Sequence, residues 1–232
     1  MVESGKRVAV VQSNYIPWKG YFDIIQRVDA FVFYDDVQYT KNDWRNRNRI
    51  KTQAGLKWLS VPTGTDLDRR ICDVPIENSH WQTKHHKSLV QAYSKARCFR
   101  QFSGWLEHVY CAQNWTNLSE LNQFVIREIA SRFLGLGTQF LSATDFLLSG
   151  RRADRLLDLL SQVGAKVYLS GPSARAYLPE AEFALAGIRV EYVTYEGYPE
   201  YEQLFPPFVH EVSILDLLLN VGDEARRYIP LR

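Results

Sequence analysis

The sequence has few cysteines and no long apolar run, and each absence excludes a class of protein. Its three cysteines, Cys72, Cys98 and Cys111, are odd in number, widely spaced and without a CxxC pair. They therefore predict reduced thiols, not a disulfide framework or a zinc knuckle. No run of about 18 apolar residues is present to span a membrane, and the first seven residues, MVESGKR, lack a signal-peptide pattern. These absences predict a cytoplasmic protein without a membrane span.

An excess of one charge is also missing. The 28 Lys and Arg residues against 26 Asp and Glu give a net charge of only +2, which argues against nucleic acid as a partner. The chain is 46% apolar and 13% aromatic over 232 residues, so it can bury a substantial core and is neither disordered nor fibrous.

The common catalytic motifs are absent as well. There is no GxGxxG, Walker, GxSxG or HExxH pattern. The sequence therefore names no metal site and no cofactor, and no pattern in it sets the oligomeric state.

What the sequence does have is two runs, 8–11 and 31–34, that are apolar on every residue and then break into polar groups. Such runs predict strands buried on both faces of a parallel sheet. Ligands collect at the carboxyl ends of such strands. The polar residues that follow the two runs are Gln12, Asn14, Asp35, Asp36 and Gln38.

Strand and helix patterns alternate along the chain, which predicts an α/β fold with a Rossmann-like, mostly parallel sheet flanked by helices. We expect one domain over 1–232, with a helical subdomain at about 80–150 leaning over the sheet edge. Strands are expected at 8–12, 31–35, 57–62, 165–169 and 188–193. Helices are expected at about 18–27, 82–97, 117–134, 151–163 and after Ser213, and 41–51 is either a loop or a strand.

The pair Asp35-Asp36 supports two interpretations. Asp36 suits a general base, a metal ligand or a group that holds a sugar hydroxyl. Equally, acids at strand ends commonly cap helices or stabilise turns.

A basic cluster follows, in which Arg45, Arg47, Arg49 and Lys51 alternate and would share one face of an extended chain. Arginine forks bind phosphate, which suggests a phosphorylated substrate such as a nucleotide-sugar. The alternative is a solvated edge strand protected by its charges.

Three shorter segments are further candidates. Residues 15–21 place Pro17 and Gly20 at a helix start, which offers N–H groups to an anion or forms a packed aromatic turn. The segment with Lys84 and His85 is expected to be helical. The two residues could act as a catalytic base or bind phosphate as a pair, or they could belong to a surface histidine cluster. Ser170-Gly171, with Tyr177 nearby, resembles an anion-binding turn.

Several blocks in this order resemble the WbqC-like family of bacteria and archaea, and the likeness covers nearly the whole chain. The blocks are VVQSNYIPWKGYFDII, DAFVFYDDVQY, WRNRNRIK, HWQTKHHKSLVQAY, VYLSGPSARAYL and SILDLLLNVG. The resemblance implies a role around amino-sugar or glycan tailoring, since members are associated with surface-polysaccharide and O-antigen gene clusters. One departure is Asn14-Tyr15, a position at which family members vary.

The resemblance also implies site residues. Asp36, His85 and Lys84 would be catalytic. The expected substrate-binding residues are Gln12, Tyr15, Gly20, Asp35, Gln38, Trp44, Asn48, Arg49, Lys51, Ser170, Gly171 and Tyr177.

Three functions remain open. The first is a transferase or ligase that attaches an acyl or aminoacyl group to a phosphorylated or nucleotide-linked sugar. The second is a nucleotidyl-transferring or adenylate-forming enzyme, although the HxGH histidines of such enzymes are absent. The third is a non-enzymatic module that binds nucleic acid or a partner protein through the basic strand.

Overall fold

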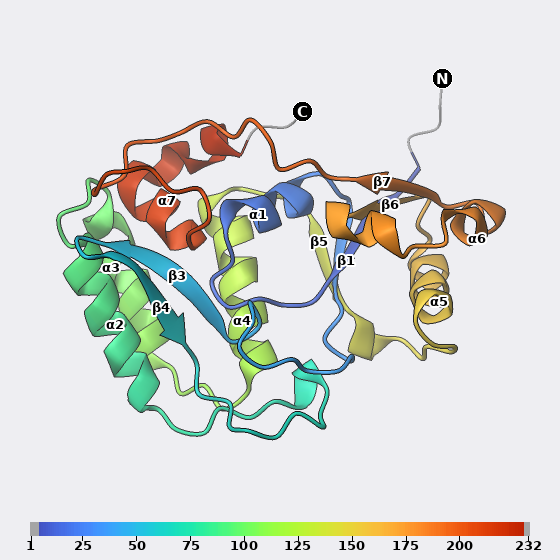
Figure 1. Ribbon diagram of the computed structural model, residues 1–232, viewed down its shortest axis with the longest axis horizontal. Helices are drawn as coiled ribbons and strands as arrows, with labels where there is room; N and C mark the ends of the chain where they lie inside the picture. The colour runs from blue at the N-terminus through green and yellow to red at the C-terminus, as the bar shows by residue number, and fades with distance from the viewer. Residues whose placement is uncertain (1–4, 230–232) are drawn as a thin grey trace.

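Five parallel strands form the central sheet of the computed structural model, which describes residues 5–229 (Figure 1). Their order across the sheet is β5-β2-β1-β6-β7, and every neighbouring pair is parallel. The α/β class and the mostly parallel sheet are confirmed. The strands are β1 (Arg7–Val11), β2 (Ala30–Phe33), β5 (Gln139–Ser142), β6 (Val167–Ser170) and β7 (Arg189–Tyr192).

The two central strands contribute to a separate apolar core on each face of the sheet. Val8 and Val32 pack into one core with residues of α5 and α6, while Ala9 and Phe31 pack into the other with residues of α1 and α4. Because side chains alternate along a strand, every residue of an apolar run is buried only when both faces are covered. This explains why residues 8–11 of β1 and 30–33 of β2 are apolar at every position.

The α-helices cover both faces and extend beyond the sheet on the side of α2 (Figure 1). They are α1 (Lys19–Gln26), α2 (His80–Tyr93), α3 (Phe99–Glu107), α4 (Leu118–Glu128), α5 (Ala153–Val163), α6 (Glu180–Leu185) and α7 (Ile214–Val221). Helix α4 continues into a π-helical turn, Ile129–Phe133.

A two-stranded antiparallel ribbon stands apart from the main sheet. It consists of β3 (Arg47–Thr52) and β4 (Gly55–Ser60), with Arg49 opposite Trp58. The ribbon packs against α2, where the Lys51 amide donates to the Tyr93 hydroxyl at 3.0 Å. The segment expected as a loop or strand at 41–51 is therefore a strand only from Arg47 onward.

The stretch at 80–150 contains α2, α3 and α4, but it also contains the edge strand β5, which pairs with β2. The four residues of β5, QFLS, carry polar ends and are only partly buried. Such a short strand has no alternation long enough to distinguish it from a loop.

The chain reverses its direction of travel across the sheet after β5. From β1 it builds β2 and β5 on one side, and it then returns to place β6 and β7 on the other. In open α/β sheets, the carboxyl ends of strands that flank such a reversal border a crevice. Here those strands are β1 and β6.

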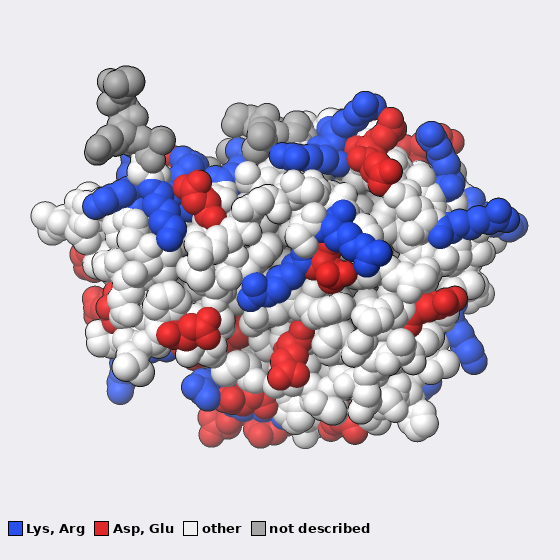
Figure 2. Space-filling view, turned by 180° about the vertical axis from the view of Figure 1, so that it is seen from behind, with Lys and Arg blue, Asp and Glu red and all other residues white. Residues whose placement is uncertain are grey.

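In the described residues, no helix has the length and apolar character needed to cross a membrane. On the face seen in Figure 2, basic and acidic side chains are intermixed.

Candidate functional site

A cleft of about 700 Å³ opens at the carboxyl ends of β1 and β6, and we call it the strand-end cleft. Four of the expected binding residues line it: Gln12, Ser170, Gly171 and Tyr177. Its other polar lining residues are Tyr34, Arg152, Tyr168, Ser173 and Tyr195.

The strands fix the floor of the cleft. The Tyr34 amide donates to the Val11 carbonyl at 3.0 Å, which continues the β1–β2 ladder to the point where the chain turns. On the other side, the Val193 amide donates to the Ser170 carbonyl at 2.9 Å. The polar residues after the strands therefore reach the same edge of the sheet.

Three tyrosines of the cleft, Tyr34, Tyr168 and Tyr195, are protonated donors at neutral pH. Burial raises the pKa of Tyr168 and of Tyr195 to about 12, and it also raises the pKa of Tyr34. The Ser170 hydroxyl donates to the Tyr168 oxygen at 3.2 Å. Phenols and hydroxyls of this kind bind sugar hydroxyls or phosphate oxygens, and the rings offer faces for stacking.

Arg152 lies at the lip of the cleft with a backbone φ of 52° and ψ of −120°. A non-glycine residue rarely adopts a positive φ, and backbone strain of this kind clusters at functional sites. It is the only Lys or Arg among the residues that line the cleft in the described part of the chain.

Asp36 stands behind the wall of the cleft. It forms an ion pair with Arg155 of α5, and Arg155 also hydrogen-bonds Tyr34, which lines the cleft. The Asp36 Oδ1 atom is buried and has no hydrogen-bond partner among the residues that the structure describes. Asp36 therefore reaches the cleft through Arg155 and Tyr34.

Asp35 is fully buried and holds the strand ends together. It accepts hydrogen bonds from the Ser13 amide at 2.7 Å, from Gln123 Nε2 at 3.0 Å and from the Ser119 hydroxyl. Its carboxylate thus links the chain after β1 to helix α4.

Gly20 lies under the ring of Trp18 at the start of α1. A Cβ at Gly20 would lie 2.2 Å from that ring, so only glycine fits. The neighbouring Lys19 is buried beneath the rings of Tyr198 and Tyr201, and burial lowers its pKa to about 8. The start of α1 packs against α7, where the Ile214 amide donates to Pro17.

The expected substrate-binding residues in and beside the ribbon differ in burial. Asn48 is buried and donates to the carbonyls of Tyr15 and Ile16 at 3.1 and 3.0 Å. Arg49 lies over the rings of Trp44 and Trp58, both of which are more than 40% exposed. The arginines therefore occupy the outer face and the asparagines the inner one.

Lys51 departs from this pattern, because the C-terminal loop covers it. Its amine donates to Gln203 Oε1 at 2.6 Å and to the Pro207 carbonyl. Burial lowers the pKa of Lys51, while the nearby buried carboxylate of Asp216 opposes that shift. Lys51 alternates with the arginines in the sequence, and this pattern did not predict that the C-terminal loop covers it.

His85 and Lys84 lie on α2, away from the strand-end cleft. Tyr15 and His85 Nδ1 share a hydrogen bond of 2.8 Å, and the Tyr15 hydroxyl also bonds to Tyr110 at 2.8 Å. Burial lowers the pKa of His85 to about 4, against a hydrogen bond to the Ser60 backbone that raises it. His85 is therefore neutral at pH 7. It is also buried, whereas the neighbouring Lys84 is exposed.

The expected residues thus fall into separate groups. The structure brings Gln12, Ser170, Gly171 and Tyr177 together, but it places Lys84 and His85 elsewhere. Gln38 is exposed and bonds to the Leu67 carbonyl.

Most of the aromatic residues that line the cleft were not singled out by the sequence analysis. Tyr34 and Tyr168 sit within or directly after expected strands, a position that signals a strand-end residue, and Tyr195 belongs to the aromatic loop before α7. No sequence pattern pointed to Arg152. Within residues 5–229, no three His, Cys, Asp or Glu side chains converge so that they could hold a metal ion.

Comparison with known proteins shows to which family this chain belongs. The model of the WbqC-like protein family matches residues 12–228. The chain is 46% identical over 226 residues to a Mycobacterium tuberculosis protein named "Uncharacterized protein Rv1507c", and the match covers 97% of each chain. No solved structure gives a significant match. The chain belongs to the WbqC-like protein family.

Proposed function

We propose that the strand-end cleft binds a phosphorylated or nucleotide-linked sugar and that the protein transfers or ligates an acyl or aminoacyl group to it. The observation that best supports this proposal is the position of the cleft, where the strand order reverses between β1 and β6. Rossmann-like sheets bind nucleotides at this place, and we propose that this sheet is used in the same way.

The lining of the cleft supports a ligand that carries rings, hydroxyls and phosphate. Tyrosine rings stack on a base or a sugar, and their hydroxyls bind polar oxygens. The exposed guanidinium of Arg152 suits a phosphate, which it binds bidentately.

In the proposed reaction, a hydroxyl or amine of the sugar attacks the carbonyl carbon of an activated acyl donor. The new bond forms to that carbon, the donor's leaving group departs, and the proton passes to Asp36. Asp36 is proposed for this role because its Oδ1 has no hydrogen-bond partner among residues 5–229 and can take a proton that a water molecule carries from the cleft, while the ion pair with Arg155 holds the carboxylate near Tyr34. His85 is less suited, because its ring already forms hydrogen bonds with the Tyr15 hydroxyl and the Ser60 backbone.

A thermal-shift screen of UDP-N-acetylglucosamine, GDP-mannose, UDP and ATP tests the binding step. At 100-fold excess over Kd, a true ligand adds about 2.7 kcal/mol of stability, which raises Tm by about 5 °C or more in a chain of this size. The control is Lys166→Gln, an exposed lysine of the described chain that does not line the cleft.

The catalytic assignment is tested with Asp36→Asn. We expect this variant to keep the thermal shift and to lose at least 100-fold in turnover once the donor is known, as measured by mass spectrometry of the sugar. Phosphorus NMR would instead detect pyrophosphate from ATP if the enzyme forms adenylates. A flat screen with all four ligands would refute the proposal.

A further inference from the structure

Two segments that contain no acidic residue face each other outside the strand-end cleft. Residues 44–65 and 78–106 contain no Asp or Glu over 22 and 29 positions, in a chain with 26 acids. The first segment contains β3 and β4, and the second contains α2. The fold places them side by side (Figure 1).

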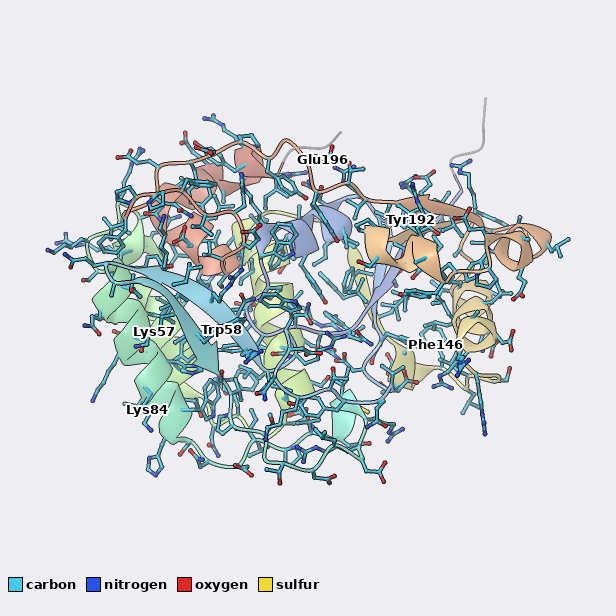
Figure 3. All side chains as sticks on the ribbon, viewed as in Figure 1. Lys57, Trp58, Lys84, Phe146, Tyr192 and Glu196 are labelled. Carbon is cyan, nitrogen blue, oxygen red and sulfur yellow. The ribbon has the colours of Figure 1, made fainter. Side chains whose placement is uncertain are left out.

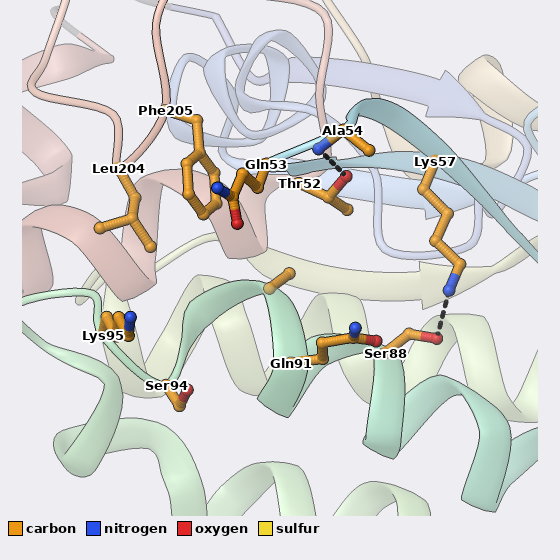
Figure 4. A pocket seen from close by; sticks show the side chains of 11 residues that line it. Thr52, Gln53, Ala54, Lys57, Ser88, Gln91, Ser94, Lys95, Leu204 and Phe205 are labelled. Carbon is orange, nitrogen blue, oxygen red and sulfur yellow. Dashed lines mark hydrogen bonds between the residues drawn. The ribbon is translucent and has the colours of Figure 1, made fainter.

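A groove runs between β4 and α2, made of two adjoining hollows of about 550 and 520 Å³. The hollows share Lys57 and Ser88, whose side chains are joined by a hydrogen bond of 2.9 Å (Figure 4). We call this the lysine groove, because its cations are Lys57, Lys84, Lys87 and Lys95.

No carboxylate lines the lysine groove in the described part of the chain. None of its lysines takes part in an ion pair between described residues. A cleft lined by one sign of charge focuses the field and attracts ligands of the opposite sign. The groove is therefore a local positive site on a protein whose net charge is close to zero.

Two of the cations lie on one stripe of α2. Lys84, Lys87 and Gln91 recur at spacings of three and four residues, which places them on one face of the helix. Lys95 lies two residues beyond the end of α2 at Tyr93, and at about 1.5 Å per residue the helix rises about 13 Å from Lys84 to that end. This span fits an extended chain of several charged units better than a single phosphate.

The rest of the lining is rich in hydroxyl and amide groups. These side chains are Thr52, Gln53, Ser60, Asn78, Ser88, Gln91 and Ser94. Trp58, which is 44% exposed, also lines the groove, and the guanidinium groups of Arg47 and Arg49 lie 4.4 and 5.6 Å from the centre of its ring. Hydroxyl and amide groups together with one ring suit a ligand with many hydroxyls.

We infer that the lysine groove binds an acidic oligosaccharide, whose carboxylates or phosphates pair with the lysines and whose hydroxyls bond to the amides. A single-stranded nucleic acid is less favoured, because its successive bases need several aromatic platforms. The groove offers one exposed tryptophan and the half-buried Phe205 at its far end. The site is separate from the cleft, and the inference does not depend on the reaction proposed there.

Isothermal titration with a hexamer of galacturonic acid tests the inference, with maltohexaose as the neutral control and a decamer of deoxythymidine as the competing polyanion. We expect the acidic hexamer to bind and the neutral one not to bind. Lys84→Gln combined with Lys87→Gln should weaken binding by about tenfold, and Trp58→Leu by about fivefold. The matched control is Lys166→Gln, an exposed lysine outside the groove, which should bind like the wild type.

The inference is overturned if the acidic hexamer does not bind, or if the groove variants bind it as tightly as Lys166→Gln. It is also overturned if deoxythymidine binds more tightly than the hexamer, since the groove would then be a nucleic-acid site. The groove lysines are exposed, so the variants should fold, which circular dichroism would check.

Discussion

The strand-end cleft and the lysine groove lie on different parts of the fold and are built from different materials. The cleft is walled by tyrosines, of which Tyr168 is buried and Tyr34 and Tyr195 are half-buried, and it is backed by the Asp36–Arg155 ion pair. The groove is walled by exposed lysines of β4 and α2 that have no acidic partner in the described chain. In Figure 3, Lys57, Trp58 and Lys84 mark the groove, while Phe146 and Tyr192 lie at the other end of the molecule.

This difference has a physical consequence. Side chains fixed by buried hydrogen bonds are preorganised, which favours one small ligand over others. Flexible exposed lysines lose rotamer entropy when they bind, so they favour ligands that carry many charges. The predictions below test whether the two regions differ in this way.

The largest expected effect is at the buried support of the cleft. Asp35→Ala removes the acceptor of three hydrogen bonds and should lower the free energy of unfolding by about 3–5 kcal/mol. Lys84→Gln in the groove should change it by less than about 0.5 kcal/mol. Urea unfolding measures both, and Asp35→Asn serves if the alanine variant does not fold. Equal effects at the two positions would remove the distinction.

The next effect is pH dependence from His85. Its pKa falls from 6.5 to about 4 on folding, so the unfolded chain binds a proton more readily. Stability from this group is present above pH 6.5 and is lost as pH falls toward 4, by at most about 3 kcal/mol. The wild type minus His85→Gln difference in unfolding free energy between pH 7 and 4 measures it.

His210 is the control for that experiment, because burial lowers its pKa as well but the side chain is only half-buried. His210→Gln should therefore keep most of the pH slope. If His85→Gln keeps it too, the buried Tyr15–His85 contact is not its source.

A pair of glycines gives the third comparison. A Cβ at Gly20 would lie 2.2 Å from the Trp18 ring, whereas one at Gly171 would lie 3.6 Å from the Tyr195 hydroxyl. Gly20→Ala should cost about 2 kcal/mol from overpacking, while Gly171→Ala should be nearly neutral for folding. Thermal unfolding with and without the nucleotide-sugar checks this, since only Gly171→Ala adds a methyl group to the lining of the cleft.

The smallest expected effect is relief of strain at Arg152. Its φ of 52° and ψ of −120° suit glycine, so Arg152→Gly should stabilise the protein by at most about 1 kcal/mol while weakening nucleotide-sugar binding. A variant that is both less stable and equally good at binding would show that the strained arginine does not serve the cleft.

The sequence predicted the parallel sheet well, because the apolar runs of β1 and β2 record burial on both faces directly. It predicted part of the cleft for the same reason, since Gln12 and Ser170 lie at strand ends. It could not predict that Lys19 is buried beneath the rings of Tyr198 and Tyr201, or that the C-terminal loop covers Lys51. Those contacts join residues distant in the chain, and local periodicity carries no trace of them.

The order of the strands was equally hidden. The short edge strand β5 is too polar and too brief to show a pattern, and no local pattern predicts that β6 pairs with β1 and not with β5. The crevice between β1 and β6 could therefore not be located from the sequence.

The most direct test of the account is a crossed titration. Tyr177→Ala and the Lys84→Gln/Lys87→Gln variant are each titrated with UDP-N-acetylglucosamine and with the galacturonic acid hexamer. Tyr177 is 75% exposed and lines only the cleft, so its loss should leave folding intact. We predict that Tyr177→Ala weakens only the nucleotide-sugar and that the lysine variant weakens only the hexamer. If either variant weakens both ligands equally, the cleft and the groove are one site and the account is wrong.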